Sequence, residues 1–227
     1  MDISDEKRKI YEYNDETYKY IEDALIYDLK LAIKKYMNLY KYENIIILCI
    51  GTNKCPGDSL GPIIGTKLNE IKLPKNVSCF GTIKKNLNAV TLPSFIEHND
   101  LEMVENLVIA IDCTFTRLAS IGSIIVNEGE LLPGKGVGKV LPSIGDFHIC
   151  GVCSNATYSK VAATIDLLTM DKRTIVQMSD MIVESLSTVL FMLFDNEKEI
   201  YNEDGTVNYN YYKTKIKKKF LNKRKNN

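Results

Sequence analysis

Residues 43–50 read Glu-Asn-Ile-Ile-Ile-Leu-Cys-Ile and end at Gly51, and this stretch decides the fold. It is short, rich in β-branched side chains and almost entirely apolar, which is typical of a strand covered on both faces. A second such run, Leu107–Ile111, ends at Asp112, and a helical pattern, Leu60–Ile71, lies between the two. Strand, helix and covered strand in this order predict a right-handed parallel crossover, and therefore a layered α/β domain.

Further elements flank these three. Gly122–Val126 is another apolar run, followed by residues typical of a turn, and Val77–Thr82 is a candidate strand. Met1–Lys41 contains apolar residues at spacings near three and four, which predicts an amphipathic helix, and Arg173–Phe194 has the same pattern. We therefore predict three parts: an N-terminal amphipathic helical segment (1–42), an α/β core domain (43–196) and a basic, flexible C-terminal tail (197–227).

Composition excludes several classes of protein. The 227 residues contain 29 Lys plus Arg and 29 Asp plus Glu, so the net charge predicts no polyanionic partner. No run of about 20 apolar residues predicts a membrane span, and the N-terminal residues do not resemble a secretion signal. The six cysteines are typical of buried thiols in a reducing compartment, and one Cys-x-x-Cys, Cys150 to Cys153, is weak evidence for zinc. We expect a cytoplasmic protein.

The loop after the first strand, Gly51–Pro62, leads into a helix and contains Asp58. Ligand sites in parallel sheets lie beyond the carboxyl ends of the strands, so this loop lies where a site is expected. Its glycine spacing matches no nucleotide-binding motif, and a carboxylate beside the start of the helix would repel a phosphate. Asp58 has two interpretations at this point: an N-cap of the helix that begins near Leu60, or a functional carboxylate.

Asp112 favours the second interpretation, because it too follows a wholly apolar strand. If the two strands are neighbours, about 5 Å apart, both carboxylates open into one crevice. Two carboxylates in a partly buried site do not both ionise easily, so we expect the pKa of one to rise. Such a pair can act as base and acid on a water molecule that attacks an amide. Alternatively the pair holds a divalent metal ion, with His148 as a candidate third ligand. The other interpretation of His148, which we favour, is a hydrogen-bonded imidazole in the core or crevice.

Five other polar residues are candidates for substrate contacts. Some lie in the same loop as Asp58 or just after Asp112, and two lysines belong to a glycine-rich segment, 133–142. These lysines either meet an acidic substrate or remain solvated. The five candidates are Asn53, Ser59, Thr114, Lys135 and Lys139.

Three motifs follow one another along the chain. They are Gly51-Thr52 with Gly57-Asp58-Ser59-Leu60-Gly61-Pro62, then Ile109-Ala110-Ile111-Asp112, then the Gly- and Lys-rich residues 133–139 with Leu141-Pro142 and Gly145-Asp146. Through these motifs the chain, from about Glu43 to Leu186, resembles the YyaC family of sporulation proteins. That family is similar in turn to the germination protease of spore-forming bacteria, which degrades small acid-soluble spore proteins, and to hydrogenase maturation proteases.

The resemblance implies a fold and a site. The fold is a three-layer α/β/α sandwich with a mostly parallel sheet, of the phosphorylase/hydrolase-like kind. The similarity to the germination protease implies that Asp58 and Asp112 are the catalytic aspartates of a peptidase that needs no cofactor. The similarity to the maturation proteases implies instead a metal ion held by Asp58, Asp112 and His148.

We therefore expect a sporulation-associated endopeptidase of the cytoplasm or forespore. Its partners are a peptide or small protein substrate and further copies of itself, with no membrane; nucleic-acid contact is limited to the basic tail. Two alternatives stay open: a non-catalytic peptide-binding or regulatory sporulation protein, and a maturation-type peptidase that depends on a divalent metal ion.

Overall fold

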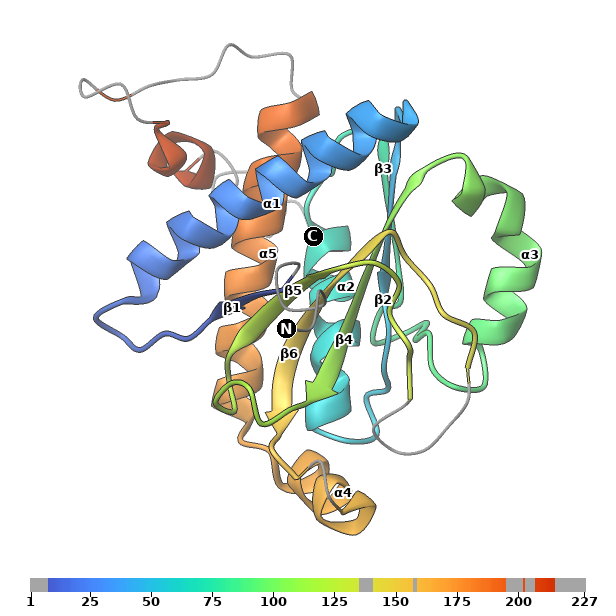
Figure 1. Cartoon of the computed structure of the whole chain (residues 1–227), viewed down its shortest axis with the longest axis vertical. Helices are drawn as coiled ribbons and strands as arrows, with labels where there is room; N and C mark the ends of the chain where they lie inside the picture. The colour runs from blue at the N-terminus through green and yellow to red at the C-terminus, as the bar shows by residue number, and fades with distance from the viewer. Residues whose placement is uncertain (1–7, 135–140, 157–158, 195–201, 203–206, 215–227) are drawn as a thin grey trace, which may run out of the picture.

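Six strands form one sheet within residues 8–134, 141–156, 159–194, 202 and 207–214, the part of the chain that this computed structural model describes (Figure 1). They are β1 (Arg8–Tyr11), β2 (Ile45–Cys49), β3 (Val77–Phe80), β4 (Leu107–Phe115), β5 (Ile124–Glu128) and β6 (Phe147–Ser154). Their order across the sheet is β1-β5-β6-β4-β2-β3. Strands β6, β4, β2 and β3 are parallel to one another, whereas β5 pairs antiparallel with β6 and β1 antiparallel with β5.

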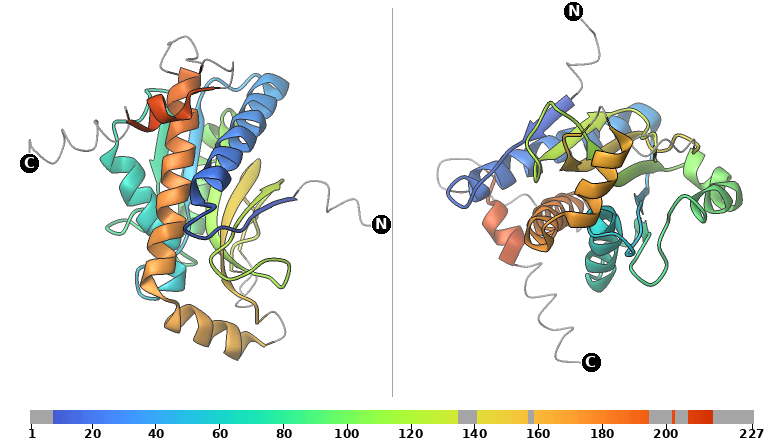
Figure 2. Two further views of the ribbon diagram at one scale, coloured as in Figure 1. Left: turned by 90° about the vertical axis from the view of Figure 1, so that its left-hand side faces the viewer. Right: turned by 90° about the horizontal axis from the view of Figure 1, so that it is seen from below.

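Helices connect these strands and cover both faces of the sheet. They are α1 (Tyr18–Tyr40), the short 3₁₀ helix η2 (Gly57–Ser59), α2 (Leu60–Glu70), α3 (Leu92–Val104), α4 (Lys160–Thr169) and α5 (Lys172–Phe194). The two side views show α1, α2 and α5 packed beside the sheet and α4 at one end of it (Figure 2).

The alternation of side chains along the central strands builds two hydrophobic layers. Ile47 of β2 and Ile109 of β4 belong to the larger layer, together with buried residues of α1, α2 and α5. Ile46 and Val108 belong to the second layer, against which Phe95 of α3 packs. The predicted three-layer α/β/α arrangement with a mostly parallel sheet is therefore confirmed.

Helix α5 lies in the middle of the larger layer. Its side chains are buried on most sides, and hydroxyls within it are satisfied by its own backbone, as where Ser187 Oγ donates to the Val183 carbonyl at 2.5 Å. By length and composition it is the one described helix that could cross a membrane, with a mean hydropathy of 1.3, but 78% of the apolar window is buried inside the fold. The same composition is what a core helix requires.

The central prediction about the sheet holds: β2 and β4 are parallel neighbours, with Ile45 opposite Leu107. The sequence analysis missed β1, β6, α3 and α4. It also ended the second apolar strand too early, because β4 continues to Phe115 and contains Asp112. The third apolar run is β5, which begins two residues later than predicted and extends into the expected turn.

The prediction of a flexible C-terminal tail is wrong for part of it. Residues 209–214 are helical, and Tyr212 and Lys213 are buried against the fold. Lys213 Nζ donates to carboxylates of Glu22 and Asp23 on α1, so a lysine that the sequence analysis assigned to solvent forms a buried ion pair instead. The remaining predicted boundaries stay predictions.

Candidate functional site

The loop from β2 to α2 is shaped by close backbone packing. Gly51 has a φ of 138°, and a Cβ there would meet the Asp58 carbonyl at 2.1 Å. The Thr52 N–H donates to that same carbonyl at 2.9 Å, which closes the loop on itself. At Gly61 a Cβ would lie 2.0 Å from the Ile50 carbonyl, so α2 begins directly against the end of β2. Glycines at these positions therefore fix where Asp58 stands.

Asp58 lies in the middle of η2, two residues before Leu60, the first residue of α2. The N-cap position of α2 is taken by Ser59, whose hydroxyl donates to the Pro56 carbonyl at 2.6 Å and does not cap the helix. The Asp58 side chain is half-buried. The N-cap interpretation of Asp58 therefore does not describe its place in the fold, and its carboxylate is directed toward β4, as the following contacts show.

Asp112 lies on β4 at the level where β2 has just ended. The Ile50 N–H donates to the Ile111 carbonyl at 2.7 Å, which ties the start of the Asp58 loop to the residue before Asp112. Asp112 is only 7% exposed, and its Oδ1 accepts a hydrogen bond from the Cys113 N–H at 2.8 Å. A buried acid is thus held in place by the strand that carries it.

The two aspartates converge as the sequence predicts. A carboxylate oxygen of Asp58, one of Asp112 and the Cys113 Sγ all lie within 4.8 Å of one another. The Cys113 thiol donates to Asp58 Oδ1 at 3.8 Å, a weak contact that bridges the two strand ends. We call Asp58, Asp112 and Cys113 the acid–thiol cluster. Among described residues it is the one group of this kind whose ligand atoms could share an ion or a water molecule.

Burial and charge change the protonation of this cluster. The pKa of Asp112 is raised well above its ordinary value, first by burial and then by the negative charge of Asp58. The pKa of the Cys113 thiol is raised as well, by its hydrogen bond with Cys153, by burial and by the charge of Asp112. Since the thiolate is the nucleophilic form, a raised pKa argues against Cys113 as a nucleophile and leaves the carboxyl pair as the reactive feature.

His148 does not join the cluster, and its contacts fit the favoured interpretation of a hydrogen-bonded imidazole better than the alternative of a third ligand. It lies on β6 opposite Ala110, two residues before Cys150, which is the residue level with Asp112. Its Nδ1 contacts the Gly129 carbonyl at 2.9 Å and its Nε2 contacts the Asn127 amide at 3.1 Å. Burial lowers the pKa of His148, which favours the neutral form of this half-buried, hydrogen-bonded ring. The third member of the cluster is Cys113, which was not among the predicted site residues.

The other predicted contact residues differ in their exposure and in their contacts. Asn53 is exposed, and its side chain contacts the Ile83 carbonyl at 3.4 Å, away from the aspartates. Ser59 is half-buried and engaged with the backbone of Pro56. Thr114 is half-buried on β4, two positions beyond Asp112 and on the same side of the strand. Lys135 and Lys139 lie outside the described residues. Substrate contact by any of the five stays a prediction.

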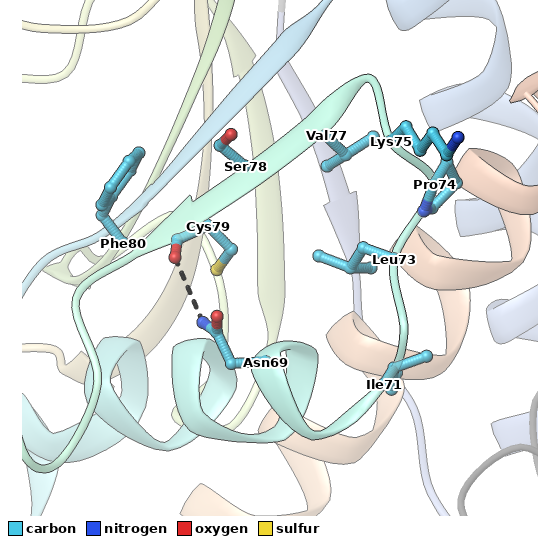
Figure 3. A pocket seen from close by; sticks show the side chains of 9 residues that line it. All are labelled: Asn69, Ile71, Leu73, Pro74, Lys75, Val77, Ser78, Cys79 and Phe80. Carbon is cyan, nitrogen blue, oxygen red and sulfur yellow. Dashed lines mark hydrogen bonds between the residues drawn. The ribbon is translucent and has the colours of Figure 1, made fainter.

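A separate pocket of about 440 Å³ lies at the far edge of the sheet, between the end of α2 and β3 (Figure 3). Asn69 donates from its side chain to the Cys79 carbonyl at 3.1 Å, which occupies one backbone group of this edge strand. Leu73 and Val77 form an aliphatic wall, and Lys75 is the single charged side chain among the lining residues. No carboxylate lines this pocket, so it does not offer the pair of acids found at Asp58 and Asp112.

Helix α4 packs directly over η2. A Cβ at Gly57 would meet Leu167 Cδ2 at 2.5 Å, so only glycine permits this approach of the helix to the residue before Asp58. The end of β6 is tied to the same place, because Cys153 Sγ contacts the Gly57 carbonyl at 3.5 Å and Ser154 Oγ donates to Asp166 of α4 at 2.5 Å. The acid–thiol cluster is thus bordered by α4.

Comparisons with known proteins identify the family to which this chain belongs. A family described as "Protein of unknown function (DUF1256)" matches residues 12–185. The "Uncharacterized protein YyaC" of Bacillus subtilis (strain 168) is 40% identical over 110 residues, 48% of this chain and 52% of that protein, so the match spans about half the length of this relative.

Among solved structures, the [NiFe] hydrogenase maturation protease HycI from Thermococcus kodakarensis KOD1 is similar over 65% of this chain and 92% of that chain. Its sequence identity is 16% and its TM-score is 0.41, too low for the likeness to bear on function. The family match covers well over half of the chain, from before α1 into α5, and includes both aspartates. This chain therefore belongs to the DUF1256 family.

Proposed function

We propose that this protein is a peptidase in which Asp58 and Asp112 activate a water molecule against a peptide bond. The observation that carries the proposal is the convergence of two carboxylates, one of them 7% exposed, within 4.8 Å at the carboxyl end of a parallel sheet. Carboxyl pairs with unequal environments are how proteins keep one acid protonated and the other ionised near neutral pH.

The environments assign the roles. Asp112, with its raised pKa, supplies the protonated carboxyl, and the more exposed Asp58 supplies the carboxylate. The Asp58 carboxylate takes a proton from water as the water oxygen bonds to the peptide carbon, and Asp112 protonates the carbonyl oxygen. When the C–N bond breaks, Asp58 gives its proton to the leaving amine, and a hydroxyl of the adduct returns a proton to Asp112. The pair ends in its starting state, with a carboxylic acid and an amine as products.

The substrate class is proposed from the resemblance to germination proteases. A purified small acid-soluble spore protein is therefore the first substrate to test, with cleavage followed by mass spectrometry. Asp58→Asn and Asp112→Asn should each lower the rate by about 100-fold or more, because each removes one member of the acid–base pair.

The matched control is Asp15→Asn, which removes an exposed carboxylate far along the chain from the cluster and should leave the rate unchanged. Circular dichroism of all three variants checks that the fold is intact. Cleavage that survives in both cluster variants would reject the proposal. Absence of cleavage by the unaltered protein, with binding retained, would favour the non-catalytic peptide-binding alternative.

A metal-dependent hydrolase is the second candidate, and the thiol in the cluster favours it. Two carboxylate oxygens and one sulfur within 4.8 Å match the ligand types of Zn²⁺, which accepts both donors at about 2.0–2.3 Å after the thiol loses its proton. A bound ion would supply a polarised water at neutral pH.

Zinc titration by calorimetry separates the two candidates. In the metal-dependent case Cys113→Ala weakens zinc binding and activity together, and a chelator abolishes cleavage. In the aspartyl case cleavage survives the chelator. Cys55→Ala is the matched control, since Cys55 is a half-buried free cysteine outside the cluster.

A further inference from the structure

The inner face of helix α4 packs against the rest of the fold. Ala163 and Leu167 are buried, and Leu167 rests on Gly57 beside the acid–thiol cluster. Asp166 accepts from Ser154, and the Ser159 hydroxyl caps the helix by accepting from the Ala162 N–H at 3.2 Å. These contacts hold the helix in one orientation without any contribution from its outer side.

The outer side of α4 carries three exposed apolar side chains next to the exposed Thr164 and Thr169. Val161, Ile165 and Leu168 are spaced by four and three residues and therefore share one face. They are 71%, 53% and 55% exposed. We call these three residues the outer stripe. In both figures α4 extends from the body of the molecule at the end of the sheet where β4 and β6 terminate (Figures 1 and 2).

Charge and size indicate what covers the outer stripe. The exposed lysines Lys160 and Lys172 lie just before and just after it along the chain, which suits acidic residues at both ends of an occupant. A stable dimer buries roughly 1,200–2,000 Å² in total, more than three side chains of one ten-residue helix provide. A short segment of another protein, by contrast, uses a few apolar anchors at helical spacing.

We propose that the outer stripe docks an amphipathic segment of a protein substrate, with apolar side chains at helical spacing and acidic residues at its ends. The inference rests on the proposed function, because the helix borders η2 and would hold the substrate chain beside Asp58 and Asp112. Docking on α4 then selects the substrate, while the cluster cleaves an adjacent extended stretch.

The test uses a fluorescein-labelled peptide of about 15 residues, with leucines at i, i+4 and i+7 and glutamates at both ends. Fluorescence anisotropy measures its binding to the full-length protein and to the Asp58→Asn/Asp112→Asn double variant, which binds without cleaving. Both should bind the peptide saturably, and a peptide of the same composition in scrambled order should not. Ile165→Asp, and independently Val161→Asp, should weaken binding at least tenfold. Leu39→Asp is the matched control: this residue of α1 is 64% exposed, and its replacement should change affinity less than twofold.

The outcomes separate the two claims. Binding of the labelled peptide, together with no cleavage of the small spore protein by the unaltered protein, would reject the peptidase proposal and keep the docking site. Failure of both proteins to bind, or unchanged affinity in the folded Ile165→Asp and Val161→Asp variants, would overturn the docking site. It would also be overturned if sedimentation shows a dimer that Ile165→Asp dissociates while peptide binding is unaffected, because the stripe would then face a second copy.

Discussion

The buried carboxyl of Asp112 is a group that folding holds in an unfavourable environment. Its pKa is raised by burial and by Asp58, so the folded protein resists the ionisation that the unfolded chain undergoes freely above its ordinary pKa of about 3.9. Stability linked to this group is therefore complete below that pH and is lost as pH rises toward the raised pKa. At neutral pH the carboxyl destabilises the fold.

Asp112→Asn should accordingly raise the free energy of unfolding at pH 7 by roughly 1–3 kcal/mol, because a tenfold change in an ionisation constant corresponds to about 1.4 kcal/mol. The asparagine oxygen can still accept from the Cys113 N–H, so the local backbone is kept. Urea denaturation at pH 7 and pH 4 measures the effect, which should shrink at the lower pH.

Asp171→Asn is the control of opposite sign. The Asp171 carboxylate accepts from the N–H and hydroxyl of Thr174 at the start of α5, both at 3.3 Å, so its replacement should lower stability. If Asp112→Asn is as destabilising as Asp171→Asn at pH 7, the buried carboxyl of Asp112 does not destabilise the fold at that pH.

At this scale the sequence reveals some members of the site and hides others. Asp58 and Asp112 could be found because each follows an apolar strand of a parallel sheet, whose carboxyl ends share one edge. Cys113 gave no signal besides its place next to Asp112. The two interpretations of His148 could not be separated from the sequence, because the register between β4 and β6, which sets His148 level with Ala110, is not encoded in spacing along one chain.

The junction of β2 and α2 is the element that positions Asp58, and it depends on backbone contact. Gly61→Ala would set a Cβ 2.0 Å from the Ile50 carbonyl, and no flexible side chain can yield there. The helix must shift away from the strand, so we expect a loss of about 1–3 kcal/mol or more in stability, and a loss of activity beyond what stability explains. Chemical denaturation and the spore-protein assay measure the two losses.

Gly129→Ala provides the comparison. Gly129 also has a positive φ, 88°, but a Cβ there meets nothing within 4 Å. It should incur only the backbone strain of a left-handed residue, roughly 1–2 kcal/mol, and leave activity intact once the protein is folded. Equal activity losses in the two variants would show that the β2–α2 junction does not position the site.

Elements were predictable where a local pattern coincides with burial. The runs that became β2 and β4 are apolar because helices cover both faces, and α5 has a continuous helical pattern for the same reason. Strand β6 was missed because His148, Cys150 and Gly151 interrupt the β-branched signature. Helix α4 was missed because its apolar residues lie on two sides, one buried and one exposed, which obscures the period.

At the scale of the whole molecule, α1 and the helical turn 209–214 meet through a buried ion pair that no local pattern predicts. Lys213 is 8% and Glu22 4% exposed, and 190 residues separate Lys213 from its second partner, Asp23. The Glu22 Oε1 oxygen is buried without a hydrogen-bond partner among the described residues. The basic composition of residues 208–227 suggested solvation, but one lysine of this stretch neutralises a carboxylate that α1 buries.

Lys213→Met should therefore release the helical turn 209–214 from α1. Removing one member of a buried pair costs about 3–5 kcal/mol when the remaining charge stays buried. If the turn detaches from α1, water reaches the Glu22 carboxylate and the charge is no longer buried. Detachment therefore costs less than leaving Glu22 buried and unpaired, and we expect the turn to detach. Limited proteolysis should cut near Tyr212 faster than in the unaltered protein, and hydrogen exchange of 209–214 should lose protection.

The double variant Glu22→Leu/Lys213→Met tests the reason, because it removes both charges and keeps apolar volume at the contact. Docking of the turn should be restored, since apolar pairs replace buried ion pairs at little or no cost in stability. Lys215, outside the described residues, provides the charge control: Lys215→Met removes the same charge from the same stretch and should leave docking unchanged. If Lys215→Met and Lys213→Met release the turn equally, general attraction between the basic C-terminal stretch and the carboxylates of α1 holds it, and the buried pair is incidental.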